Sequence, residues 1–373
     1  MVAGVVDSPK RLVIKVGSSL LVDAHGEIKR AWLTTLVADI AARHRSGAQI
    51  IIVSSGAIAL GARRLHLTKG GRASLEDAQA AAATGQIALA GCWSELLAHH
   101  QINAAQILVT LDDFEDRRRY LNVTATLERL LSLRVVPVIN ENDSVATSEI
   151  RVGDNDRLAE RVAQAAGASE VILFSDVDGL FDADPTVDAH ATLIPVVQRI
   201  DAKIMAMAST ATASGMGSGG IGSKLEAARS ATSAGIDLVL VSGQHDHPLK
   251  RLAMGGVGTR FLAQSSTSSH KAWLAGRLKI KGRIVVDAGA AAALARGGVS
   301  LLPAGAVSVD GKFVRSDVVD IVGYDGHVIA RGLSEYDAAE VANICGKRSD
   351  MLAGVLGYAP RAALVHCDHM VLL

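Results

Sequence analysis

Short hydrophobic runs alternate with longer amphipathic or alanine-rich stretches between residues 10 and 260. The runs lack the hydrophobic–polar alternation of a half-exposed strand, which predicts strands that are buried on both faces. The predicted strands are 11–16, 49–53, 104–109, 135–139, 171–175 and 236–243. The predicted helices are 31–45, 76–99, 120–131, a segment that begins near Asp156 and a segment that begins at Lys224. Strands that alternate with helices at this spacing predict an α/β fold, a three-layer αβα sandwich around a largely parallel sheet.

Polar residues gather on both sides of the loop that follows the strand 135–139. Residues 140–143 (Asn-Glu-Asn-Asp) leave the strand, and residues 153–156 (Gly-Asp-Asn-Asp) begin the next helix. In open α/β sheets, ligands bind beyond the carboxyl ends of the strands. Asn, Asp and Gly are also ordinary turn and N-cap residues, so either group of polar residues by itself predicts a turn. Two such groups, one on each side of a single loop, favour a ligand site.

Small polar residues follow three other predicted strands. These residues are Gly17, Ser18 and Ser19 after the first strand, Ser54, Ser55 and Gly56 after the second, and Ser175 and Asp176 after the strand 171–175. A glycine–serine turn can present backbone N–H groups to an anion, although a plain tight turn has the same composition. Lys15 lies near the end of the first strand, where a surface lysine is the simplest alternative.

A glycine-rich segment, 214–224, leads into a helix that Gly235 is suited to end. The backbone N–H groups and the dipole at such a helix start both favour phosphate binding. The segment is not a Walker P-loop, because its glycine spacing and its ending differ and because it follows a helical stretch, 200–210. A flexible linker is the alternative interpretation.

Residues 263–272 mark the best domain boundary, because they are rich in Ser and Thr and show no apolar periodicity. Beyond them, short β-like segments are broken by glycine turns. The expected strands there are 278–286, 299–302, 306–309, 313–315 and 318–322, and the expected helices are 288–296 and 335–344. We therefore predict an α/β domain over 1–262, a linker over 263–277 and a small β-rich domain over 278–373.

Composition narrows the class of protein. The chain has 373 residues, more than one domain usually holds, and 38 Lys and Arg balance 38 Asp and Glu. That balance gives no overall basic field for nucleic acid or membrane. Three widely spaced cysteines predict neither a disulfide framework nor a metal site, as in a reducing cytosol. The N-terminus lacks a signal-peptide layout and no apolar run is long enough to span a bilayer, so we expect a cytoplasmic location.

Six motifs together resemble the amino acid kinase family, in the branch that phosphorylates L-glutamate. They are KVGSS (15–19), VSSGAI (53–58), PVINENDSV (137–145), VGDND (152–156), SDVDGL (175–180) and GMGSGGIGSK (215–224). Ser18 stands where the family usually has Thr. Residues 278–360 resemble a PUA domain, which is named for pseudouridine synthase and archaeosine transglycosylase. Aspartokinases, acetylglutamate kinases and uridylate kinases share the fold, but they resemble this chain less at NEND and GDND and do not usually carry this tail.

The resemblance implies ATP-dependent phosphorylation of the γ-carboxylate of L-glutamate to L-glutamyl 5-phosphate with Mg²⁺, the first step of proline biosynthesis. It also implies feedback inhibition by proline, a cytoplasmic homo-oligomer (dimer or tetramer) and coupling to glutamyl phosphate reductase. Another small-molecule kinase of the same fold is the alternative, and a substrate panel in an ATP-turnover assay would distinguish the two. A role in RNA binding or modification is a third reading, suggested by the tail, but the charges of residues 278–360 balance and leave no basic footprint.

The residues in these motifs are suited to the phosphoryl transfer that the resemblance implies. A glutamate carboxylate has a pKa of about 4.3 and is ionised at pH 7, so transfer requires alignment and charge neutralisation, with no general base. The predicted catalytic residues are Lys15 and Lys224 and, by resemblance, Asp156, which would hold both lysines. The predicted ATP-binding residues are Lys15, Ser175, Asp176, Ser218, Gly219, Gly220, Ile221, Gly222, Ser223 and Lys224. The predicted glutamate-binding residues are Ser55, Gly56, Asn140, Asp143 and Asn155, among which Asp143 would meet the α-ammonium group. No protein metal cage is predicted, because Mg²⁺ takes most of its ligands from phosphates and water.

Overall fold

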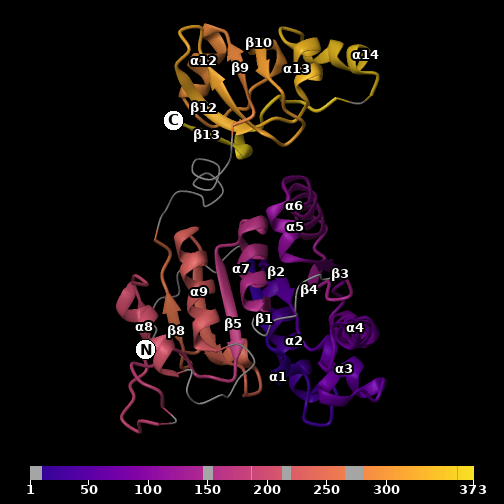
Figure 1. The fold of residues 1–373 in the computed structure, drawn as a ribbon, viewed down its shortest axis with the longest axis vertical. Helices are drawn as coiled ribbons and strands as arrows, with labels where there is room; N and C mark the ends of the chain where they lie inside the picture. Colours follow the sequence, from indigo (N-terminus) through magenta and orange to yellow (C-terminus); the bar gives the residue numbers. More distant parts are fainter. Residues whose placement is uncertain (1–10, 146–153, 186, 212–219, 265–279, 359) are drawn as a thin grey trace. The chain divides into compact units, whose positions relative to one another are not determined.

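The computed structural model describes residues 11–145, 154–185, 187–211, 220–264, 280–358 and 360–373. The chain divides into two compact units, Met1–Ser266 and Thr267–Leu373 (Figure 1). Most of the predicted linker, 263–277, lies outside the described residues. The predicted domain limits therefore stay predictions, and each unit is described by itself.

The first unit is built on an eight-stranded sheet with the strand order β3-β4-β2-β1-β5-β7-β8-β6. Its strands are β1 (Arg11–Val16), β2 (Gln49–Val53), β3 (Ala104–Val109), β4 (Val136–Glu141), β5 (Glu170–Ser175), β6 (Val196–Val197), β7 (Asp237–Ser242) and β8 (Thr259–Phe261). All neighbouring pairs from β3 to β7 are parallel, and β8 runs antiparallel to β7. The largely parallel sheet predicted from the sequence is confirmed, and the short strands β6 and β8 are additions to the prediction.

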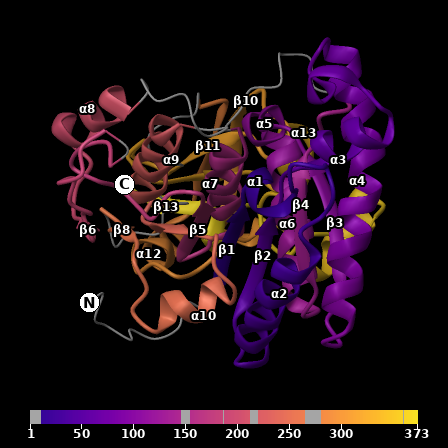
Figure 2. The same cartoon turned by 90° about the horizontal axis from the view of Figure 1, so that it is seen from below.

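Helices cover both faces of this sheet. They are α1 (Ser18–Leu21), α2 (Arg30–Arg45), α3 (Ala57–Arg64), α4 (Leu75–Ala98), α5 (Leu111–Glu115), α6 (Arg117–Ser132), α7 (Asp154–Ala166), α8 (Ala202–Ala211), α9 (Ile221–Ser233) and α10 (Pro248–Ala253). Helices α2, α4 and α10 pack on one face, and α5, α6, α7 and α9 pack on the other (Figure 2). The predicted three-layer αβα sandwich is confirmed.

Alternation along β1 explains why its sequence is apolar throughout. Leu12 and Ile14 belong to the core under α2 and α4, whereas Val13 belongs to the core under α7 and α9. A strand covered on both faces has no solvent side, so every position favours a hydrophobic residue. The two cores hold the sheet rigid between the helix layers, and its strand ends can therefore position side chains accurately.

Gly235 ends α9 as predicted. Its φ angle is +78°, and the N–H of Ile236 donates to the carbonyl of Ala231 at 3.0 Å. That bond, together with a left-handed glycine just beyond the helix, is the usual helix-ending arrangement. It turns the chain directly from α9 into β7.

The second unit has a five-stranded sheet in the order β10-β9-β11-β12-β13. Its strands are β9 (Gly282–Val286), β10 (Ala306–Gly311), β11 (Val318–Val322), β12 (Val328–Leu333) and β13 (Met370–Leu372), and its helices are α12 (Ala288–Ala295), α13 (Ala338–Ile344) and α14 (Leu352–Leu356). It has a hydrophobic core of its own, which includes Ile284, Ile321 and Tyr336. The prediction of a separate β-rich domain is confirmed.

Two strands predicted in the second unit are wrong. Residues 299–302 contribute only a single bridge, between Leu301 and Val365, and residues 313–315 form no strand. Phe313 is instead a core side chain at a turn, so its hydrophobicity reflects burial rather than strand pairing.

Within the described residues of the whole chain, no helix is long and apolar enough to cross a membrane.

Candidate active site

The register of the first sheet brings the predicted site residues to one edge. Lys15 of β1 is paired with Val53 at the end of β2, and Val53 is paired with Ile139 of β4. Ser54 directly follows Val53, and Asn140 directly follows Ile139. Because the strands are parallel, their carboxyl ends meet at the same edge, which is where ligands bind in such sheets.

Asp156 joins the two predicted catalytic lysines. Lys15 Nζ lies 2.6 Å from Asp156 Oδ1, and Lys224 Nζ lies 3.3 Å from Asp156 Oδ2. Asp156 is in the first turn of α7, Lys224 is in the first turn of α9, and only 1% of Asp156 is exposed. The structure therefore brings together three residues that are far apart in the sequence.

The charge state of this cluster follows from its surroundings. Burial by itself would raise the pKa of the Asp156 carboxyl group, but the ammonium groups of Lys15 and Lys224 outweigh burial and lower that pKa below its ordinary value. Asp156 is thus ionised at neutral pH. With both lysines charged, the cluster carries a net positive charge in a poorly solvated place, where an anionic group is attracted strongly.

Helix α9 begins beside the lysine pair. Its N-cap is the exposed Gly220, whose position offers no side chain to cap the first turn. The hydroxyl of Ser223 donates to the Gly220 carbonyl at 3.0 Å and lies 3.4 Å from Asp156 Oδ2. An uncapped helix start next to two lysines suits a phosphate group. The predicted residues Ser218 and Gly219 lie outside the described residues.

A second cluster, made of neutral side chains, lies at the ends of β2 and β4. Asn155 Nδ2 donates to Ser55 Oγ at 2.6 Å and lies 3.4 Å from Asn140 Oδ1. Asn140 Nδ2 in turn donates to Gln86 Oε1 at 2.8 Å. The structure thus connects three of the predicted glutamate-binding residues to a residue of α4 that sequence reasoning missed.

Gln86 could have been found from its position in α4. It shares one helix face with Leu89 and Trp93, at spacings of three and seven residues, and all three are buried. Trp93 Nε1 donates to Ser54 Oγ at 2.9 Å, so the same face reaches the end of β2. A glutamine on the buried face of a helix requires a polar partner, and that requirement was the overlooked signal.

The remaining predicted glutamate residues flank this cluster. Gly56 is the N-cap of α3 and has a φ angle of +97°, a conformation that L side chains rarely adopt. Asp143 lies buried in the turn that follows β4. A buried carboxylate in the turn that follows Asn140 is suited to a ligand that carries an ammonium group.

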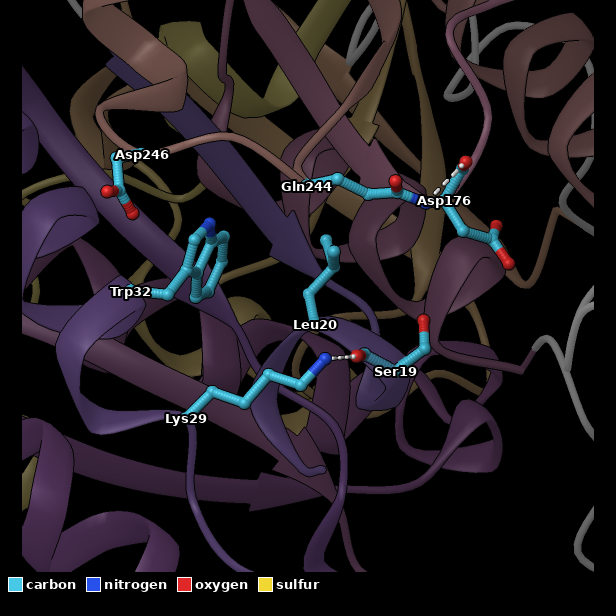
Figure 3. A pocket seen from close by; sticks show the side chains of 7 residues that line it. All are labelled: Ser19, Leu20, Lys29, Trp32, Asp176, Gln244 and Asp246. Carbon is cyan, nitrogen blue, oxygen red and sulfur yellow. Dashed lines mark hydrogen bonds between the residues drawn. The ribbon is translucent and has the colours of Figure 1, made fainter. Parts of the chain in front are cut away.

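Asp176 lines a cavity of about 250 Å³ at the ends of β1, β5 and β7. Figure 3 shows the side chains around it, which are Ser19, Leu20, Lys29, Trp32, Asp176, Gln244 and Asp246. Lys29 Nζ donates to the Ser19 carbonyl at 2.8 Å, and Gln244 Nε2 donates to the Asp176 carbonyl at 3.0 Å. Ser175 Oγ donates to Asp176 Oδ1 at 3.0 Å. Neither the Lys15–Asp156–Lys224 cluster nor the amide cluster lines this cavity, so it adjoins the candidate site rather than containing it.

Two protein-family models match this chain, one in each of its two units. The amino acid kinase family model matches residues 10–242, and the PUA domain model matches residues 282–356. The chain belongs to the amino acid kinase family.

Curated relatives make the resemblance more specific. The chain is 60% identical to a protein of Zymomonas mobilis subsp. mobilis, over 97% of this chain and 91% of the relative, and 61% identical to a protein of Sphingopyxis alaskensis, over 97% of both. Both relatives are named glutamate 5-kinase. Among solved structures, carbamate kinase from Giardia lamblia bound to AMP-PNP is similar with a TM-score of 0.49, at 15% identity, over 69% of this chain and 99% of that one.

Proposed function

We propose that this chain is a glutamate 5-kinase, which transfers the γ-phosphoryl group of ATP to the γ-carboxylate of L-glutamate and so begins proline biosynthesis. The observation that carries the proposal is the buried Lys15–Asp156–Lys224 cluster at the carboxyl edge of the sheet. Identity of 60% to a relative named glutamate 5-kinase, over 97% of the chain, supports the substrate.

The reaction needs no general base. A γ-carboxylate oxygen of glutamate attacks the γ-phosphorus, a new oxygen–phosphorus bond forms, and the bond from that phosphorus to the bridging oxygen breaks to release ADP. The carboxylate is ionised at pH 7, since its pKa is about 4.3. The protein therefore has to align the two substrates and neutralise the charge that develops on the transferred group.

Lys15 and Lys224 are the groups that we assign to charge neutralisation. Two ammonium groups near one phosphoryl group repel each other, and Asp156 between them offsets that repulsion. Because Asp156 bonds one lysine through each carboxylate oxygen, it also sets the direction of both side chains. Lysines that are fixed before the reaction do not have to reorganise during it, which is how preorganised charge accelerates transfer.

Glutamate would be held by the neutral cluster and its neighbours. Ser55, Asn140 and Asn155 offer hydroxyl and amide groups for the α-carboxylate and α-ammonium groups, and Asp143 offers a negative charge for the ammonium. Gly56 would let the backbone approach the substrate closely, because it has no Cβ. These assignments rest on motif resemblance and on the proximity of Ser55, Asn140 and Asn155.

The start of α9 fits the nucleotide phosphates. Gly220, Ile221, Gly222 and Ser223 form the helix start beside Lys224, and Ser175 and Asp176 would lie near the nucleotide. No group of three or more His, Cys, Asp or Glu side chains gathers as a metal cage among the described residues. Magnesium would neutralise phosphate charge when bound with ATP, and it would take its ligands mainly from phosphates and water.

Several further properties stay predictions from the family resemblance. They are the magnesium requirement, inhibition by proline, a homo-oligomer, coupling to glutamyl phosphate reductase and a cytoplasmic location.

A substrate panel tests the proposed function. ATP turnover is measured with glutamate, aspartate, N-acetylglutamate, carbamate and UMP, each with and without magnesium. We expect turnover with glutamate, dependence on magnesium and inhibition by added proline. Turnover with another member of the panel and none with glutamate would replace the proposal by a different small-molecule kinase.

A further inference from the structure

We propose that Gln86 is a positioning residue for glutamate recognition: it accepts a hydrogen bond from Asn140, so that Asn140 presents its own oxygen to Asn155 and helps to hold Asn155 with Oδ1 toward the α-ammonium group of the substrate. This inference rests on the proposed function and deepens it. Gln86 is assigned no contact with glutamate or ATP, and its effect passes through Asn140 and Asn155.

One backbone carbonyl sets the direction of the chain. Asn155 Nδ2 lies 3.2 Å from the carbonyl oxygen of Ser54. A backbone carbonyl can only accept a hydrogen bond, so the amino side of the Asn155 amide must face it. The same amino group donates to Ser55 Oγ at 2.6 Å. The orientation of Asn155 therefore follows from its partners, although oxygen and nitrogen of an amide have nearly the same shape.

The orientation passes from Asn155 to α4. Because Asn155 presents its amino group, Asn140 must present Oδ1, at 3.4 Å. The amino group of Asn140 then points away from Asn155 and donates to Gln86 Oε1 at 2.8 Å. Turning Asn140 around would place two donors together on one side and two acceptors on the other. Gln86 supplies the acceptor that makes the observed direction the favourable one.

This direction leaves Asn155 Oδ1 available for a ligand. With its amino group facing Ser54, the Asn155 oxygen faces the opposite way, and it is buried without a hydrogen-bond partner among the described residues. A buried acceptor without a donor is unfavourable, so such an atom at a ligand site indicates where a donor binds. Glutamate carries only one donor group at neutral pH, its α-ammonium.

Helix α4 is a rigid support for this arrangement. Gly61 of α3 and Gly85 of α4 bring the two helix backbones into contact: a Cβ on Gly85 would lie 1.9 Å from the Ala57 carbonyl oxygen. Trp93, on the same face as Gln86, donates to Ser54 Oγ at 2.9 Å. Helix α4 thus holds Asn140 through Gln86 and the Ser54 turn through Trp93.

Three variants test the role of Gln86. Gln86→Met keeps the length of the side chain and removes the acceptor, whereas Gln86→Glu keeps an acceptor oxygen at the same position. Gln106→Met, at an exposed site of β3, is the matched control for the substitution itself. We expect Gln86→Met to raise KM for glutamate about fivefold, as for the loss of one hydrogen bond, with KM for ATP and kcat within about twofold of wild type. Gln86→Glu should restore most of the lost affinity.

A second measurement isolates the ammonium group. Glutarate has the two carboxylates of glutamate and no amino group, and its inhibition constant against glutamate is measured for wild type and for Gln86→Met. We expect this constant to stay unchanged while KM for glutamate rises. Equal weakening of glutamate and glutarate would mean that Gln86 only supports the fold, and would overturn the inference. If Gln86→Met does not fold, Gln86→Ala takes its place in the same comparison.

The outcomes separate this inference from the proposed function. Wild-type protein that does not turn over glutamate refutes the proposed function. Wild-type protein that does, together with an unchanged KM for glutamate in Gln86→Met, refutes only the role of Gln86.

Discussion

The two halves of the candidate active site are held together by different forces. In the phosphate half, Lys15 and Lys224 are held by ion pairs to one buried carboxylate, Asp156. In the glutamate half, Asn140 and Asn155 and their partners are held by hydrogen bonds between neutral groups. Both halves lie at the same edge of one sheet, yet they should respond differently to change.

The difference follows from how each force depends on geometry. The attraction between charges falls slowly with distance and does not depend on angle, so the phosphate half should tolerate small displacements but not the loss of a charge. A hydrogen bond weakens steeply as its angle departs from linear, so the glutamate half should be sensitive to reorientation. Changes in the first half should therefore appear in kcat, and changes in the second in KM for glutamate.

The largest effect is expected from removing a lysine charge. Lys15→Met or Lys224→Met should lower kcat by on the order of 100-fold or more, because each lysine stabilises charge that develops mainly in the transition state. The fold should survive, since Asp156 keeps one ammonium partner in either variant. ATP turnover at saturating glutamate measures the effect.

Lys203→Met, at an exposed site of α8, is the control and should leave kcat unchanged. A near-normal kcat in either test variant would show that the lysine concerned does not act on the transferred group.

Asp143→Asn tests whether the negative charge of Asp143, in the glutamate half, contributes to glutamate binding. The variant keeps the shape of the side chain and removes the charge that would meet the α-ammonium group. We expect KM for glutamate to rise at least about tenfold, equivalent to about 1.4 kcal/mol, with little change in KM for ATP. Inhibition by proline, whose amine is also cationic, should weaken in parallel. A higher KM for ATP with an unchanged KM for glutamate would show that Asp143 does not bind glutamate.

Gly85→Ala tests the dependence of the glutamate half on geometry. The added Cβ would meet the Ala57 carbonyl oxygen at 1.9 Å, so α3 and α4 must separate and carry Gln86 with them. We expect a loss of about 1–3 kcal/mol in the free energy of unfolding, measured with urea, and a higher KM for glutamate.

Gly91→Ala is the matched control in the same helix. Nothing lies within 4 Å of a Cβ at Gly91, and a helix interior favours Ala over Gly by up to about 1 kcal/mol. This variant should be as stable as wild type or more so. If Gly85→Ala and Gly91→Ala destabilise the protein equally, the contact between α3 and α4 is not the reason that alanine at position 85 is unfavourable.

The smallest effect is expected from removing the second unit. All described residues of both halves precede Ser266, and the first unit has hydrophobic cores that contain no residue of the second. A chain ended at Ser266 should keep kcat and both KM values within about twofold of the full-length chain. Loss of folding or of turnover would show that the tail completes the kinase unit.

Much of the first unit could be predicted because its central strands are buried on both faces. A run such as 49–53 has few alternatives to a buried strand, and the polar residues after it mark the site edge. The tail was harder to predict, because three of its strands, β9, β10 and β12, contain glycine and are only partly buried. The strand β12 (Val328–Leu333) contains Ala330 and Gly332, which are poor strand formers, and it escaped prediction.

Gln86 escaped prediction for a different physical reason. The face that Gln86 shares with Leu89 and Trp93 indicates that it is buried and needs a polar partner, but that partner, Asn140, lies on another element. Sequence periodicity can indicate that a position is buried, but it does not reveal which buried groups meet across the fold. The Lys15–Asp156–Lys224 cluster was anticipated only because family motifs named its members together.

The distance along the chain between Lys15 and Lys224 has a consequence for how the protein acquires activity during synthesis. The polypeptide emerges from the ribosome N-terminus first, and Asn140, Asn155 and Asp156 are all made well before α9. Until α9 packs against α7, Asp156 lacks its ion pair with Lys224, and the nascent chain lacks one of the two lysine charges that we assign to phosphate binding. A chain that has only partly emerged therefore lacks a group that ATP turnover needs, and the appearance of turnover during refolding should report the packing of α9 against α7.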